Sequence, residues 1–197
     1  MAPPREPATF CDTDEEVIAL AKAQPGKLTF ASSGAGASNH LAGELFKTMA
    51  GVNIVHVPYK GDAQATADLI GGQGQMMFTL SAGATPHIRG GKVRPIALLN
   101  DKRSRLLPDI PTVAETLPGF EANGWFALFA PAGTPPEIVQ RLNAEVNRIL
   151  DQPEVKQRYA DLGAITVGGS PEKLRDQVKA EVERWAEVIR LTQMKVE

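Results

Sequence analysis

The residues with the clearest chemical potential lie in the segment 28–41, where a β-type run enters a turn of small residues and leaves as a helix. The turn contains Gly34 and Gly36, whose missing side chains allow a ligand to approach the backbone closely. Amides in the first turn of a helix lack internal partners, and the helix dipole makes that end positive. This glycine loop is therefore predicted to hold a small anion, most simply a carboxylate.

Hydroxyl groups near the loop add hydrogen-bond donors. Ser32 and Ser38 flank the glycines, while Tyr59 and Thr79 each follow a further predicted strand. Structural roles remain open alternatives: Ser38 as an N-cap, Tyr59 as a half-buried aromatic side chain, and Thr79 in a turn. The candidate ligand-binding residues are Ser32, Gly34, Gly36, Ser38, Tyr59 and Thr79.

The sequence predicts no catalytic centre, metal site or cofactor. Cys11 is the only cysteine, and we expect it in an unstructured tail, which argues against a thiolate nucleophile. No Gly-x-Ser-x-Gly elbow or complete phosphate-binding loop is present. His40, His56 and His87 lack the helical spacing of metal ligands. We expect His40 to be neutral and packed, and His56 to be structural.

Composition excludes several classes of protein. The chain has 197 residues, 43% of them hydrophobic, and a formal net charge of −2. This balance does not favour nucleic acid or an acidic membrane as a partner. No apolar run reaches the ~18 residues of a membrane span. The proline-rich start does not resemble a secretory signal, so a cytoplasmic location is expected if Met1 is the true start.

Short strands alternate with helices along the first half of the chain, which predicts an α/β fold with a mostly parallel sheet. In such sheets, ligands bind beyond the carboxyl ends of the strands, where the glycine loop and the segments 58–61 and 79–84 would meet. The predicted strands cover 28–31, 54–57, 75–78, 93–99 and 125–130.

Capping residues and apolar spacing predict the helices. Thr13 and Glu16 form a capping box before a helix, and Thr134 and Glu137 form another. The last helix is expected to begin after Ser170. The predicted buried faces comprise Leu41, Leu45 and Met49 after the glycine loop, and Ile138, Leu142, Val146 and Ile149 in the second half. Trp125 and Phe126 are expected to pack at a junction between lobes.

From about Thr13 onward, the chain resembles the substrate-binding proteins of tripartite tricarboxylate transporters, the Bug or TctC family. Several short motifs carry this resemblance. None of them is specific alone, but their order and spacing over most of the chain are specific. The segments that carry the resemblance are 25–28, 32–46, 55–61, 76–78, 86–88, 107–115, 118–121, 125–126 and 130–135.

The resemblance implies a type II periplasmic-binding-protein-like architecture, in which two lobes close on a small carboxylate. Residues 13–120 would form a largely complete second lobe and residues 121–197 the C-terminal part of the first, after a disordered tail over 1–12. Family members begin with a signal peptide and a βαβ segment that are not found here, so the chain looks truncated. Its carboxylate ligand, transporter partner and periplasmic location are likewise implied by the family.

The leading hypothesis is an extracytoplasmic solute-binding receptor for a carboxylate, or a truncated form of one, rather than an enzyme. The alternatives are an α/β enzyme acting on a small organic acid and a non-functional fragment. With part of one lobe missing, we expect an exposed apolar face and either poor stability or self-association.

Overall fold

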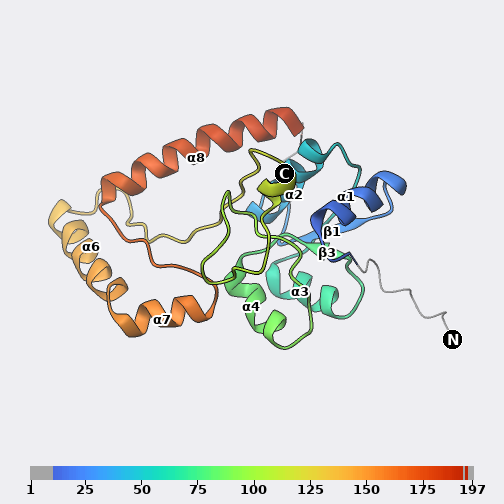
Figure 1. Ribbon diagram of the computed structural model, residues 1–197. Helices are drawn as coiled ribbons and strands as arrows, with labels where there is room; N and C mark the ends of the chain where they lie inside the picture. The colour runs from blue at the N-terminus through green and yellow to red at the C-terminus, as the bar shows by residue number, and fades with distance from the viewer. Residues whose placement is uncertain (1–10, 193, 195–197) are drawn as a thin grey trace.

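The computed structural model describes residues 11–192 and 194 (Figure 1). Short strands alternate with helices in the first half of the chain, and the second half is helical with long extended connections. The elements are α1 (Asp14–Ala23), β1 (Thr29–Ser32), α2 (Ser38–Ala50), β2 (Val55–Pro58), α3 (Asp62–Ile70), β3 (Met76–Met77), α4 (Ser81–Arg89), α5 (Val113–Thr116), α6 (Pro136–Leu150), α7 (Pro153–Asp161) and α8 (Pro171–Thr192).

The three strands form one parallel sheet in the order β2-β1-β3. This arrangement confirms the predicted α/β class with a parallel sheet. The prediction of a strand over 93–99 is wrong, because Leu98 makes only an isolated bridge to Thr112. Pro95 lies within that run and has no amide hydrogen to donate to a ladder.

The main core lies where α1 and α2 pack beside the sheet. Phe30 of β1, Ile54 and Phe120 are completely buried, and Phe46 and Phe120 meet edge to face. Cys11 is also buried in this cluster, so the predicted tail over 1–12 is wrong at that residue. The rest of the predicted tail, apart from Asp12, lies outside the described residues.

Helix α1 begins where its capping residues predict. The Thr13 hydroxyl accepts a hydrogen bond from the Glu16 amide, and the Glu16 carboxylate accepts one from the Asp12 amide. Val17 and Ile18 are buried on the face of α1 that packs into the core. The second predicted capping box is not formed, because Pro135 is the N-cap of α6.

Helix α2 buries a different face from the one predicted. Ala42 and Phe46 are buried, whereas Met49 is 36% exposed. Gly43 lies closely against Phe30 of β1, Phe46 is buried in the core, and Leu45 packs against that core while only partly buried. Spacing by four is shared by several faces of one helix, so it did not identify the buried face.

Helices α6 and α7 lie apart from the sheet, and α8 runs from them back to α2 (Figure 1). The segment 125–130 is extended but unpaired, so the predicted strand there is wrong. Phe126 is 84% exposed, which contradicts its predicted burial between lobes. The predicted face of α6 is also unburied. A strand needs a neighbouring strand, and the described residues supply none here.

Two hydroxyl contacts connect α4 to the segment that follows α7. Ser81 donates a hydrogen bond of 2.8 Å to the Gly163 carbonyl. The Thr85 hydroxyl lies 3.0 Å from the Leu162 carbonyl and 2.8 Å from the Ser81 carbonyl of its own helix, so its one hydrogen is shared between them. Thr85 is only 5% exposed. These contacts fix the end of α7 against the sheet-containing part of the molecule.

Within residues 11–192, no helix is long and apolar enough to cross a bilayer, and this includes the long helix α8.

Candidate ligand-binding site

The glycine loop, residues 33–37, joins β1 to the N-terminus of α2. Ala37 is the N-cap in an extended conformation, and it offers no capping side chain. The prediction of Ser38 as N-cap is therefore wrong, since Ser38 is the first helical residue. Among the described residues, no acceptor bonds the amides of Ser38 and Asn39. These two amides are therefore available to a ligand.

Four of the five amides of the loop, those of Ser33, Gly34, Gly36 and Ala37, are used internally. Gly34 donates its amide hydrogen to the Ser32 hydroxyl at 3.1 Å, and Gly36 donates to Nδ1 of His40 at 3.0 Å. Ser33 donates to the Asn39 side-chain oxygen. The expectation that Gly34 and Gly36 present free amides is therefore wrong. The loop turns back on itself, and the protein satisfies its partly buried donors.

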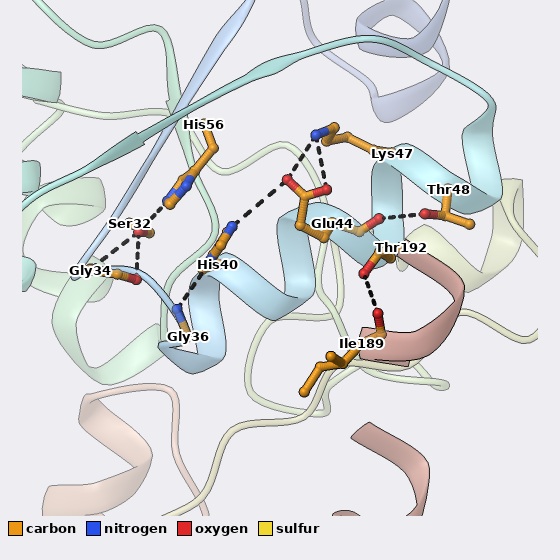
Figure 2. Close-up of polar contacts among 10 residues, drawn as sticks. All are labelled: Ser32, Gly34, Gly36, His40, Glu44, Lys47, Thr48, His56, Ile189 and Thr192. Carbon is orange, nitrogen blue, oxygen red and sulfur yellow. Dashed lines mark hydrogen bonds and ion pairs between the residues drawn. The ribbon is translucent and has the colours of Figure 1, made fainter. Parts of the chain in front are cut away.

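Ser32 points away from the solvent. It is completely buried, and its hydroxyl oxygen lies 2.6 Å from Nε2 of His56 (Figure 2). His56 comes from the neighbouring strand β2, in register with Phe30. Ser32 thus links the glycine loop to the sheet.

The rings of His40 and His56 are stacked, with centroids 3.6 Å apart and planes 9° apart. Burial, followed by the nearby His40 and Lys47, lowers the pKa of His56 to about 4. Burial also lowers the pKa of His40, although the Glu44 carboxylate opposes this shift. Both rings are neutral near pH 7, in agreement with the expectation for His40.

Glu44 and Lys47 continue this chain of contacts along α2. Nε2 of His40 lies 3.8 Å from a Glu44 carboxylate oxygen, and Lys47 pairs with Glu44 at 2.7 Å (Figure 2). Glu44 is 9% exposed, so the pair lies partly out of the solvent. This series of side-chain contacts runs from the glycine loop at the N-terminus of α2 to the last turn of that helix.

A large open cavity, about 2450 Å³ in volume, faces the N-terminus of α2. Of the six candidate residues, Ser38 and Thr79 line it, while Ser32, Gly34, Gly36 and Tyr59 do not. Ser81, which follows the same strand as Thr79 and could also donate a hydroxyl, lines the cavity too; sequence reasoning missed further polar residues on this lining, among them Asn39, Asp62 and Asn123.

Two of the missed residues stand out. The Asn39 side chain donates a hydrogen bond of 2.9 Å to Asp62, which fixes it beside the free amides of α2. The Asn123 side-chain oxygen is buried and has no partner among the described residues. The glycine-loop motif contains Asn39 and gives a signal for it, whereas no local pattern marks Asn123.

Tyr59 lies at the end of β2, and its amide donates to the Ser32 carbonyl. A hydrogen bond with the Asp68 carboxylate, and burial after it, raise the pKa of the phenol. The hydroxyl is therefore directed to Asp68 of α3, and a role for Tyr59 in ligand binding stays a prediction.

Across residues 11–192 and 194, no group of three or more His, Cys, Asp or Glu side chains is placed to hold a metal ion.

Comparisons with known proteins agree with the fold and extend it. The UPF0065 protein of the tcbD-tcbE intergenic region of Pseudomonas sp. is 42% identical over 176 residues, which are 88% of this chain and 52% of that protein. A solved structure of R. palustris Rpa4515 with adipate superposes with a TM-score of 0.91 at 36% identity. MatC of Rhodopseudomonas palustris with bound malate superposes with a TM-score of 0.80 at 34% identity.

The chain spans about half the length of that first relative. It covers 63% of each of the two solved chains, while 95% of its own residues are matched in both. The shared fold is the periplasmic-binding-protein fold, of which this chain forms a part. The model of the tripartite tricarboxylate transporter family receptor matches residues 1–194. The chain therefore belongs to the TctC family of tripartite tricarboxylate transporter receptors.

Proposed function

We propose that this chain is part of an extracytoplasmic receptor that binds a small dicarboxylate and delivers it to a tripartite tricarboxylate transporter. The single observation that carries the proposal is the close structural match to a family member solved with adipate, supported by the match to one solved with malate. Adipate and malate both have two carboxylates on a short chain.

The amides at the N-terminus of α2 are the proposed carboxylate contact. Ser38 and Asn39 have unbonded amides at the positive end of the helix, and both residues line the cavity. Thr79 lines the same cavity and offers a hydroxyl. Ser32, Gly34 and Gly36 act in this proposal by shaping the loop, and Tyr59 is retained as a predicted contact.

Lobe closure is the proposed mechanism. In this proposal, residues 13–120 form one lobe and the described residues after 120 return into the other, with the connections between them acting as hinges. A ligand held between the lobes would favour the closed form and present a new surface to the transporter.

A second reading, an enzyme acting on a small organic acid, has one specific observation to consider. The Ser32 hydroxyl oxygen lies 2.6 Å from Nε2 of His56, which is the hydrogen-bond distance expected between a nucleophile and its base. However, Ser32 is completely buried and neither residue lines the cavity. A substrate carbonyl has no route to this hydroxyl, so the geometry favours a structural role.

Calorimetric titration with adipate and malate tests the proposal, and we expect saturable binding of at least one. Ser38→Pro deletes the proposed amide donor, and proline is accepted at a first helical position that follows an extended residue. Ser38→Ala is the matched control, because it removes only the hydroxyl. Affinity should fall about tenfold or more in Ser38→Pro, the loss expected for a hydrogen bond to a charged group.

Circular dichroism melts should show that both variants are folded. The proposal fails if neither diacid binds to the folded wild-type chain, or if Ser38→Pro binds as tightly as wild type.

A further inference from the structure

The His40 ring caps the glycine loop from inside the helix. Its Nδ1 accepts the Gly36 amide hydrogen, so Nδ1 carries no proton and the ring proton lies on Nε2, facing Glu44. The N-cap, Ala37, has no side chain that could do this. Because the capping contact goes to Gly36, the amides of Ser38 and Asn39 are left for the cavity.

His56 holds the other end of the same loop. Ser32 bridges the two parts, since its hydroxyl oxygen contacts His56 and accepts the Gly34 amide hydrogen. Of the two stacked rings, His40 therefore contacts Gly36 directly, and His56 is connected to Gly34 through Ser32 (Figure 2). Phe30 stacks on the His56 ring at 4.9 Å between centroids, which confines the pair.

We propose that His40 and His56 are positioning residues that keep the glycine loop in its ligand-binding shape only while both rings are neutral, so that acid releases the loop and weakens dicarboxylate binding. The part of this proposal that concerns ligand affinity rests on the proposed function.

Protonation acts directly on the contacts described. A proton on Nδ1 of His40 converts the acceptor of the Gly36 amide into a second donor facing it. A second positive charge on His56 would lie 3.6 Å away, ring to ring. Either event removes the support of the loop.

The charged groups around the pair do not reverse this argument. Glu44 favours a charged His40, but Lys47 binds both carboxylate oxygens of Glu44 and opposes that charge. On the other packed elements, Asp62 of α3 bonds Asn39, and β1 contributes no titratable side chain. The charged residues of α8 nearest the end that meets α2 pair with each other, Arg190 with Glu187.

Nuclear magnetic resonance of the full chain tests the proposal without a ligand. In wild type, the protection factor of the Gly36 amide should be high at pH 7 and should fall as the pH is lowered toward 4. His40→Ala should lower the protection factor about tenfold at pH 7, the scale of one lost hydrogen bond. His40→Asn should retain more protection than wild type at pH 4, because the Asn oxygen replaces Nδ1 and does not titrate, and only His56 is left to become charged.

His87→Asn is the matched control, since His87 lies in α4 and contacts neither ring; it should behave as wild type. Titration with adipate and malate at pH 7 and pH 4 then measures the effect on affinity, which should fall by a larger factor in wild type than in His40→Asn. The fall in His40→Asn includes the protonation of the ligand's own carboxylates, which is common to both proteins.

The results separate the two proposals. Equal Gly36 protection in wild type and folded His40→Ala would overturn the positioning role, whatever binds. Absence of binding at any pH, with the Gly36 results as expected, would overturn the proposed function and leave the control of the loop by the histidines standing. An equal fall in affinity between pH 7 and pH 4 in wild type and in His40→Asn would overturn the acid release.

Discussion

Gly43 of α2 and Phe30 of β1 are so close that a Cβ atom on Gly43 would lie 2.2 Å from a ring carbon of Phe30. Phe30 has no exposed surface, and its ring meets Phe78 edge to face, so it cannot move aside. This contact sets the distance between α2 and the sheet, and therefore the position of the N-terminus of α2, where the glycine loop ends.

Gly43→Ala should therefore destabilise the chain, although alanine favours helices. Overpacking at a rigid contact costs about 1–3 kcal/mol, more than the ~1 kcal/mol gained in helix propensity. Gly83→Ala in α4 is the matched control, because its Cβ would meet no heavy atom nearer than 3.9 Å. Urea unfolding should give opposite signs for the two variants, and a stabilised Gly43→Ala would contradict the packing described.

The stacked histidine pair predicts a specific dependence of stability on pH. His56 has a pKa of about 4 in the folded chain, below the ordinary value of about 6.5. The unfolded chain therefore binds a proton first as the pH falls. The low pKa of His56 therefore contributes at most about 3 kcal/mol to the free energy of unfolding. This contribution is present in full above about pH 6.5 and is lost between about pH 6.5 and 4.

His56→Gln keeps a polar atom facing Ser32 and does not titrate. Urea unfolding at several pH values should show a smaller loss of stability in acid for this variant than for wild type. Parallel pH profiles of the two proteins would argue against a depressed pKa at His56.

The contact between α4 and the end of α7 should control the position of the α6–α7 pair. Thr85→Val removes the buried hydroxyl that bonds the Leu162 carbonyl, at a cost of about 0.5–1.5 kcal/mol. Amide exchange in residues 159–165 should accelerate. Thr134→Val serves as control, because that hydroxyl bonds only Pro131 within an exposed turn. Unchanged exchange in Thr85→Val would mean that other contacts hold α7.

The extended segments 125–130 and 164–169 form an exposed apolar face. Phe126 is 84% exposed and Ile165 is 74% exposed, and such faces drive association in water. We expect the isolated chain to sediment as oligomers and to bind a hydrophobic dye. The double variant Phe126→Ser, Ile165→Ser should shift it toward monomer.

Val182→Ser is the control for that experiment, since Val182 is 63% exposed on α8 but lies outside the cavity lining. Monomeric wild-type chain with a cooperative melt would contradict this prediction and the expectation of instability.

Local patterns in the sequence determined the elements whose causes are local. Alternating short strands and helices indicated the parallel sheet, and Thr13 and Glu16 marked the start of α1 because capping partners lie three residues apart. The glycine loop was found in the same way, from residues adjacent in the chain. The ordered motifs along the chain identified the family.

Only the tertiary structure decided how the loop is held and which residues share the cavity. Gly36 donates to His40, and His56 arrives from another strand to stack on that ring; no local spacing encodes that meeting. Asn123 reaches the cavity through long-range packing. Strand formation at 125–130 likewise depends on a neighbour outside the segment. Hydrogen bonds and burial depend on which surfaces packing brings together, and the chain's local preferences do not specify that by themselves.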